Sequence, residues 1–263
     1  MNNCILHTIR PKITIITVVF NSVDLIEKTI LSVIEQVNVN VEYIVIDGGS
    51  SDGTVGVINK YLEKIDVFVS EKDSGIYFAM NKGIELATGH WINFLNAGDS
   101  LLFDLQELYL YNNNSTPFLY GTAIVKDIHG HELYKSGRKI LKSDFLDSMP
   151  ICHQAIFYSC TFLINYNLNY KIIADRVMTY NILNEKHIPV FDDKIIVEYL
   201  EGGLSYKSIK LRVREEIMFL REVNNLTFRR LFSIIFTYYI KLPIYNKIRS
   251  IQTISHIYSF VKN

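Results

Sequence analysis

The sequence predicts an α/β protein whose mostly parallel sheet is flanked by helices and followed by a C-terminal helical extension. Three observations support this: strand-like and helix-like periods alternate over the first hundred residues, polar side chains follow each expected strand, and the chain is helical from about residue 209. With 263 residues, 49% of them hydrophobic, it can bury a sizeable core.

The first element is "ITIITVVF" (13–20), a continuous β-branched run typical of a strand buried on both faces. Residues 22–36 follow it with apolar side chains at helical spacing. The same alternation continues through a strand at 41–47, a helix at 54–62, a strand at 66–70, a helix at 76–87 and a strand at 90–96. Such alternation predicts βαβ units with right-handed crossovers.

Beyond residue 104 the pattern becomes less regular. Strands are expected at 117–127, 133–137 and 150–159, with a turn at "HGHE" (129–132), which indicates mixed or antiparallel structure added to the sheet. We therefore predict a catalytic body over 1–205, divided into a nucleotide-sugar half (1–104) and an acceptor half (105–205), and a tail over 206–263.

Charge is unevenly distributed, although the formal net charge is zero. The segment 207–263 holds eleven basic and three acidic residues, about +8 against −8 for the rest, so an anionic partner is expected for the tail alone. Nucleic acid is not expected, because no DNA- or RNA-binding motif accompanies the charge.

The cysteines and the N-terminus predict a cytoplasmic protein. Cys4, Cys152 and Cys160 form no C-x-x-C pair, so neither a disulfide framework nor a zinc site is expected. "MNNCILHTIRPK" has no apolar signal region with a cleavage site.

Polar side chains follow four successive strands. Ligands of parallel sheets bind beyond the carboxyl ends of the strands, so these side chains predict a polar ligand site, although any one of them could be only a turn former. They are Asn21, Asp47, Glu71 with Asp73, and Asp99. The loop "IDGGSSDGT" (46–54) adds glycines that permit close ligand approach, but it is neither a dinucleotide fingerprint nor a P-loop.

"TVVFN", "VIDGGSSDGT" and "SEKDSGIYFAMNKGIELATGHWINFLNAGD", in this order, resemble the family 2 glycosyltransferases of the GT-A fold, especially bacterial enzymes of O-antigen and capsular polysaccharide synthesis. The resemblance is continuous over about 12–104. It resumes at "PICHQAIFY" and "YKIIADRVMTYNIL", and weakly at "EYLEGGLS".

The resemblance implies a nucleotide-sugar donor, UDP-linked by expectation, and assigns the residues that hold it. These are Phe20, Asn21, Asp47, Asp52, Asp73, Asn81, Lys82, Asn96 and Ala97. The family's D-x-D motif, which binds a divalent cation, falls on residues 96–99, so Asp99 is the expected ligand of Mn²⁺ or Mg²⁺. A hard cation can be held by one or two carboxylates plus substrate phosphates, and it stabilises the departing diphosphate.

Two further residues are assigned roles. Asp175 matches the family's general base, which takes the proton of the acceptor hydroxyl in an inverting transfer; alternatively it only caps a helix. His153 either contacts the pyrophosphate, the metal or the acceptor, with metal ligand as the expected role, or is a hydrogen-bonded core residue. The chain departs from the family pattern at Asn96, which brings the cation no charge, and at Phe78, where relatives commonly carry Asp.

We therefore predict an inverting, metal-dependent glycosyltransferase that acts on a polyprenyl-diphosphate-linked glycan. The alternatives are a noncatalytic membrane-associated subunit with a degenerate site and a sugar nucleotidyltransferase. "RRLFSIIFTYYIKLPIY" is too short to span a bilayer and reads as an amphipathic helix. It either lies in an anionic membrane surface at the inner face of the cell membrane or packs on the domain or a second subunit.

Overall fold

The computed structural model describes residues 11–37, 39–111, 115–184, 186–201 and 208–241. The chain divides into two compact units, Met1–Gly203 and Leu204–Asn263. The boundary predicted between residues 205 and 206, and the part of the predicted tail beyond Lys241, lie outside the described residues.

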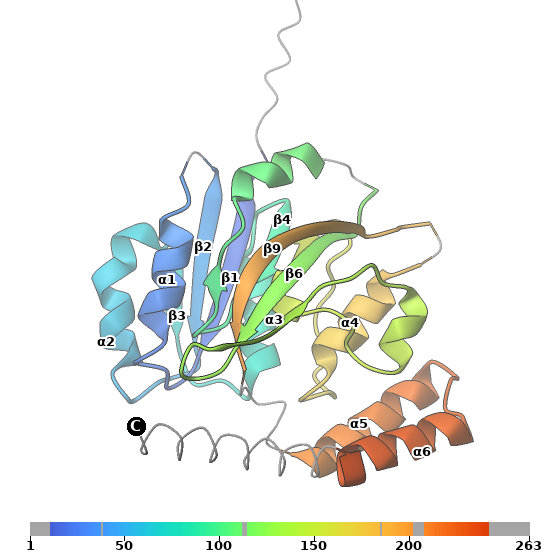
Figure 1. Ribbon diagram of the computed structural model, residues 1–263. Helices are drawn as coiled ribbons and strands as arrows, with labels where there is room; N and C mark the ends of the chain where they lie inside the picture. Colours follow the sequence, from blue (N-terminus) through green and yellow to red (C-terminus); the bar gives the residue numbers. More distant parts are fainter. Residues whose placement is uncertain (1–10, 38, 112–114, 185, 202–207, 242–263) are drawn as a thin grey trace, which may run out of the picture. The chain divides into compact units, whose positions relative to one another are not determined.

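Four parallel strands form one half of the sheet in the first unit. They are β1 (Ile13–Val19), β2 (Val41–Asp47), β3 (Val67–Ser70) and β4 (Trp91–Phe94), in the order β3-β2-β1-β4 (Figure 1). Every residue of β1 is buried, because the strand has a hydrogen-bonded neighbour on each side and both of its faces are covered. The predicted parallel core is confirmed.

Helices connect these strands as predicted. They are α1 (Ile26–Ile34), α2 (Thr54–Ile58) and α3 (Ile76–Leu86), and α1 lies beside α2 (Figure 1). The helix predicted over 54–62 is α-helical only to residue 58 and continues as a 3₁₀ helix, Asn59–Lys64, which agrees with the low helix propensity of Gly56 at its centre.

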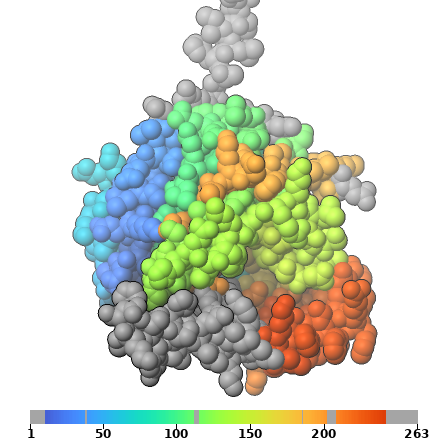
Figure 2. Space-filling model, in the orientation of Figure 1, coloured from blue at the N-terminus to red at the C-terminus, as the bar shows by residue number. Residues whose placement is uncertain are grey.

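The other half of the sheet is mixed. It contains β8 (Ile156–Ser159), β6 (Phe118–Lys126), β9 (Val190–Leu200) and β5 (Ser100–Leu101) in that order beyond β4, while β7 (Glu132–Ser136) pairs with β6. β6 runs parallel to β9 and antiparallel to β7 and β8. In the space-filling view the hairpin of β6 and β7 (yellow-green) lies on the visible face beside β9 (orange) (Figure 2).

Two differences from the predicted elements bear on the site. β9 was not predicted, because Asp192, Asp193 and Lys194 interrupt its apolar pattern. The strand expected over 150–159 begins only at Ile156, since His153–Ala155 forms a short 3₁₀ helix. The backbone oxygens of Gln154 and Ile156 both accept hydrogen bonds from the buried Asn93 side chain, each 2.8 Å long, which fixes this bend beside β4.

The second unit is a helical pair. α5 (Ile209–Glu222) and α6 (Phe228–Phe236) are joined by a turn in which Asn224 adopts a left-handed backbone, and a π-helical turn, Thr237–Lys241, follows α6. The tail is therefore helical as expected, but broken. Among the described residues no helix is long and apolar enough to cross a bilayer.

Candidate functional site

The loops that leave β1 and β2 are tied together by hydrogen bonds. The Asn21 side-chain oxygen accepts from the backbone N–H of Ser51 (2.9 Å), and the Asn21 N–H donates to the hydroxyl of Ser50 (2.8 Å). The N–H of Val23 donates to Asp52 (3.1 Å). In this arrangement Asn21 adopts a left-handed backbone conformation, φ 46°, which asparagine tolerates better than most residues. The two predicted loops thus form one rigid surface.

Asp47 organises this surface from within. Its carboxylate is fully buried and accepts hydrogen bonds from the N–H groups of Gly49 (3.1 Å) and Ser50 (3.0 Å) and from the hydroxyl of Ser70 on β3 (2.7 Å). A carboxylate engaged in this way shapes a loop. The structure therefore does not present Asp47 as a free acceptor for a ribose.

Asp52 also holds its loop through hydrogen bonds, whereas the ring of Phe20 is exposed and could contact a ligand. Asp52 accepts from the N–H and hydroxyl of Thr54, at 3.0 and 2.6 Å, and the hydroxyl bond is the main cause of its lowered pKa. Phe20 is 61% exposed at the end of β1. An aromatic ring in this position is suited to stacking against a nucleobase.

The start of α3 approaches the glycines that follow β2. A Cβ atom on Gly48 would lie 2.7 Å from the Asp73 carboxylate, and Asp73 accepts from the N–H of Gly75 (2.8 Å). Lys82, on the same helix, pairs with Glu71. The third strand exit is thus packed directly onto the second, and Gly48 is required for that contact.

The turn "NAGD" at the exit of β4 is held by a threonine of α1. The hydroxyl of Thr29 accepts from the N–H of Gly98 (2.9 Å) and donates to the backbone oxygen of Asp99 (2.7 Å). Gly98 has φ 102°, and Leu200 of β9 packs against it so closely that a Cβ atom would lie 2.9 Å from Leu200 Cδ2. The N–H of Leu200 donates to Asp99 Oδ1 (2.9 Å).

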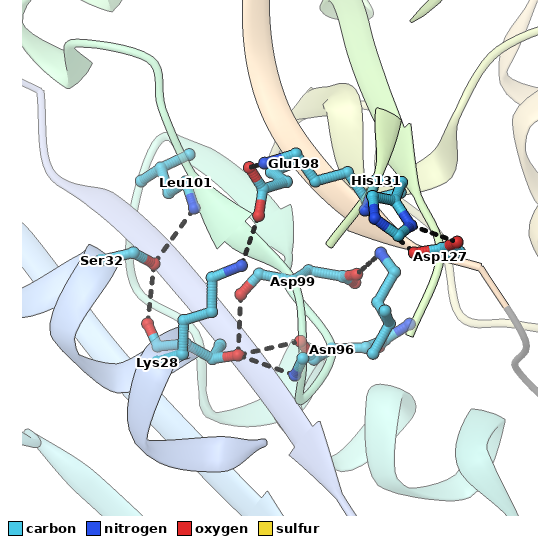
Figure 3. A network of polar contacts seen from close by, with 12 residues as sticks. Lys28, Ser32, Asn96, Asp99, Leu101, Asp127, His131 and Glu198 are labelled. Atoms are coloured by element: carbon cyan, nitrogen blue, oxygen red, sulfur yellow. Dashed lines mark hydrogen bonds and ion pairs between the residues drawn. The ribbon is translucent and has the colours of Figure 1, made fainter. Parts of the chain in front are cut away.

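Two oxygens of this turn are buried with no hydrogen-bond partner among the described residues: Oδ1 of Asn96 and Oδ2 of Asp99 (Figure 3). Burial raises the pKa of Asp99 to about 8, against the smaller opposing effects of backbone hydrogen bonds and of Lys28. Buried carboxylate oxygens without partners are costly unless a proton or a cation satisfies them. Both oxygens are of the kind that a hard cation binds.

The protein supplies few further ligands. In the described part of the chain no three His, Cys, Asp or Glu side chains gather around one point. Ala97, between the two oxygen donors, is half-buried and contributes no side-chain ligand. Figure 3 shows Lys28 reaching from α1 to Glu198 of β9, which also pairs with Lys126. This pair links α1 to β9 beside Asp99.

Asp175 lies in the first turn of α4 (Ala174–Ile182) and is half-buried. Its Oδ1 accepts from the hydroxyl of Tyr77 on α3 (3.0 Å), and its Oδ2 has no hydrogen-bond partner among the described residues. The N-cap of α4 is Ile173, with no side-chain cap. The alternative that Asp175 is only a helix cap is therefore wrong.

His153 has a core environment. Its Nε2 lies 2.7 Å from the hydroxyl of Tyr166, its ring stacks on Phe94 with centroids 5.3 Å apart, and burial lowers its pKa despite the opposing charge of Asp175. A neutral imidazole whose Nε2 is engaged in this way matches the second interpretation of this residue. These contacts do not support the predicted metal role of His153.

Asn81 also has a different contact from the expected one. Its side-chain oxygen accepts from the N–H of Tyr166 (2.7 Å) and its amide donates to the Tyr166 carbonyl (3.0 Å). This pair of bonds joins α3 to the segment that precedes α4. Both the amide nitrogen and the oxygen of the Asn81 side chain thus contact the Tyr166 backbone.

Two residues of the site were missed from the sequence. Thr29 is a polar residue within the apolar face of α1, and that position could have indicated it. Tyr77 looks like an ordinary core aromatic in "GIYFAM", and only the fold brings its hydroxyl to Asp175.

Comparison with known proteins shows which family the chain resembles. Residues 14–171 match the family model described as Glycosyl transferase family 2. A "PGL/p-HBAD biosynthesis glycosyltransferase" of Mycobacterium bovis is 29% identical over 210 residues, which cover 74% of this chain and 79% of the relative.

Two solved structures share the fold. S. aureus TarS 1-349 in complex with UDP-GlcNAc has a TM-score of 0.63 at 17% identity, covering 86% of this chain and 71% of that one. The mannosyltransferase PcManGT from Pyrobaculum calidifontis, in complex with GDP-Man and Mn²⁺, has a TM-score of 0.61 at 16% identity, covering 87% and 70%. These likenesses confirm the predicted GT-A fold. Because the family model covers more than half of the sequence, the chain belongs to glycosyl transferase family 2.

Proposed function

We propose that this glycosyltransferase moves a sugar from a UDP-linked donor to an acceptor hydroxyl with inversion at the anomeric carbon. The observation that carries the proposal is the pair of buried, unpartnered oxygens on Asn96 and Asp99 at the exit of β4. They lie at the carboxyl end of the parallel strands, where α/β folds bind their ligands. The UDP complex of the structural neighbour supports the choice of nucleotide.

The reaction needs a base and a place for the charge of the leaving group. The acceptor oxygen attacks C1 of the donor sugar, its proton passes to Oδ2 of Asp175, and the bond between C1 and the diphosphate oxygen breaks. Nucleoside diphosphate leaves with the electron pair of that bond. A divalent cation, when bound, neutralises the diphosphate charge.

Asn96 and Asp99 would hold that cation, with phosphate oxygens and water as its remaining ligands. The N–H of Leu200 holds Oδ1 of Asp99 (2.9 Å), so Oδ2 is the carboxylate oxygen left for the cation. Phe20 and the loop built on Asp47 would form the side of the site that faces the nucleobase and ribose. In this proposal Asp47, Asp52, Asp73 and Asn81 act through the shape of the loops that they hold.

Substitution of the two acids tests the proposal. Asp99→Ala and Asp175→Asn should each abolish sugar transfer while the fluorescence of Trp91, the single tryptophan, still reports a folded sheet. Purified protein with Mn²⁺ would be screened against UDP-, GDP- and dTDP-sugars by hydrolysis and binding. Full activity in either variant contradicts the role assigned to that residue.

The proposed acceptor is a polyprenyl-diphosphate-linked glycan of a bacterial surface polysaccharide, O-antigen or capsule, reached at the cytoplasmic face of the membrane. The second unit supports this location. One face of α6 and its π-helical turn exposes large apolar side chains, and the rings of Phe232 and Phe236 stack with centroids 6.1 Å apart. The exposed apolar residues are Phe228, Phe232, Ile235, Phe236, Tyr239 and Ile240.

The charges of this unit favour an anionic bilayer as the partner of that face. Two of its three described acidic residues, Glu215 and Glu216, are buried and only Glu222 is exposed, whereas five basic side chains are exposed. An amphipathic helix of this kind binds anionic membrane through buried apolar area and electrostatic attraction. The exposed basic residues are Lys210, Arg214, Arg221, Arg229 and Lys241.

Vesicle binding tests the membrane contact. The full chain should float with phosphatidylcholine–phosphatidylglycerol vesicles and weakly or not at all with pure phosphatidylcholine. Phe232→Glu with Phe236→Glu should reduce this binding at least about tenfold, while Ile128→Glu, an exposed apolar position of the first unit, should not. Equal binding by all three proteins, or dimerisation through this face in place of vesicle binding, contradicts the proposal.

The alternative of a noncatalytic subunit is favoured by one observation: the "NAGD" turn has a single carboxylate, and one of its oxygens already accepts from the N–H of Leu200. Such a subunit would bind a nucleotide sugar without hydrolysing it. The sugar nucleotidyltransferase alternative is not supported, because the matched family is a glycosyl transferase family.

A further inference from the structure

We infer that Tyr77 is a positioning residue for Asp175: its hydroxyl holds one carboxylate oxygen and thereby aims the other at the acceptor hydroxyl. The inference rests on the proposed role of Asp175 as the base. It deepens that role by explaining how a side chain at the start of α4 is fixed relative to the nucleotide-binding half.

The hydrogen bonds of the Tyr77 hydroxyl are the first observation that supports the inference. The Tyr77 hydroxyl lies 3.0 Å from Asp175 Oδ1 and 3.0 Å from the backbone oxygen of Ile172. One hydroxyl has one proton, and an ionised carboxylate is a stronger acceptor than a carbonyl. The ionised base therefore takes the bond on Oδ1, and Oδ2 is the oxygen left for a proton from the acceptor.

The packing of α3 and of the Tyr77 side chain supports the inference further. α3 packs on β1 so closely that a Cβ atom on Gly83 would lie 2.5 Å from Cγ2 of Ile16. The Tyr77 side chain is almost fully buried, and its ring packs on that of Tyr166 with centroids 5.1 Å apart. Because α3 is packed closely on the sheet and the Tyr77 ring is buried, the position of the Tyr77 hydroxyl relative to the sheet is restricted.

A second anchor on the same face of α3 completes the arrangement. Asn81 follows Tyr77 by one helical turn, so both side chains point to the same side. Asn81 holds the backbone of Tyr166 through two hydrogen bonds, 2.7 and 3.0 Å long. α3 thus fixes the segment before α4 at one point and the Asp175 carboxylate at another, both from the helix that also lines the third strand exit.

Tyr77→Phe tests the inference because it removes only the hydroxyl. Hydrolysis of UDP-glucose and UDP-N-acetylglucosamine would be measured with Mn²⁺ and water as acceptor, together with UDP affinity by calorimetry. We expect kcat to fall roughly tenfold to a hundredfold, because a misplaced base loses orientation, while KM and UDP affinity change by less than about twofold. A merely structural role would not separate kcat from nucleotide binding.

Two further variants sharpen the test. Tyr61→Phe removes another tyrosine–carboxylate bond, from Tyr61 to Glu27 (2.7 Å), and should leave kcat unchanged. The double variant Tyr77→Phe with Asp175→Asn should be no slower than Asp175→Asn alone, because Tyr77 acts through Asp175.

The outcomes separate the two proposals. Full activity of Asp175→Asn overturns the role of the base. Loss of activity in Asp175→Asn with unchanged kcat in Tyr77→Phe overturns only the positioning role, as does a Tyr77→Phe variant in which UDP affinity falls along with kcat.

Discussion

The buried carboxylate of Glu42 gives a stability prediction that the structure fixes in size and in pH range. Glu42 lies near the start of β2, at the end of the sheet opposite the candidate site. Its two oxygens accept four hydrogen bonds: from Lys12 Nζ (3.0 Å), from the Thr14 hydroxyl (2.6 Å), and from the Thr88 hydroxyl (2.6 Å) and N–H (2.7 Å). Glu42→Gln places an amide N–H₂ group against these donors.

The magnitude follows from the pKa. Burial by itself would raise the pKa of Glu42, but the hydrogen bonds from Thr14, Thr88 and Lys12 lower it from its ordinary 4.5 to about 2. At about 1.36 kcal/mol per unit, the ionised group contributes roughly 3 kcal/mol to the free energy of unfolding at pH 7. Because the folded-state pKa is the lower one, this contribution is complete above pH 4.5 and is lost as the pH falls toward 2.

The assay is denaturant unfolding of the wild type and Glu42→Gln, followed by the fluorescence of Trp91 in the same sheet. The variant should be about 2–3 kcal/mol less stable at pH 7, and the gap should shrink by roughly 2 kcal/mol at pH 3. The exposed Glu63→Gln should change stability by less than about 0.5 kcal/mol at either pH. A gap that is absent at pH 7, or that stays constant to pH 3, refutes the reasoning.

Three other predictions concern the site and its support. Gly83→Ala should destabilise the protein by about 1–2 kcal/mol, because its Cβ would overlap Ile16, whereas Gly56→Ala in open space should stabilise it by up to about 1 kcal/mol; chemical denaturation compares the two. Thr29→Val should cost about 1–2 kcal/mol and slow sugar transfer, because it removes the bonds that hold the "NAGD" turn; unchanged transfer would contradict this. Calorimetry should show weak Mn²⁺ binding that strengthens when UDP is added, because Asp99 is the only carboxylate of that turn; tight binding to the protein alone would show that the ligand set is wrong.

The positions of Asp99 and Asp175 were accessible from sequence because they follow from local rules and from the family resemblance. A β-branched run predicts a buried parallel strand, and the residue after such a strand lies at the ligand-binding edge. This reasoning located Asp99, and the family resemblance located Asp175 at the start of its helix.

The contacts of the other predicted residues could not be read from sequence. Asp47 and Asn81 are polar residues in the expected places, yet their hydrogen-bonding groups are taken up by Ser70 and Tyr166, which lie 23 and 85 residues away. His153 was assigned two roles, and the hydroxyl of Tyr166 favours the core one. Which polar group is free for a ligand depends on such long-range partners.

The sequence by itself determined the α/β architecture, the order of strands and helices along the first hundred residues, and the edge of the sheet at which a ligand site is expected. Each of these follows from the hydrophobic period of short segments and from the direction of the chain. Tertiary structure decided which atoms at that edge remain available. Leu200 reaches Asp99 across 101 residues and Tyr77 reaches Asp175 across 98, and no local pattern encodes either contact. Packing of β9 and α3 therefore determines which oxygen of Asp99 and which oxygen of Asp175 remain without a partner among the described residues.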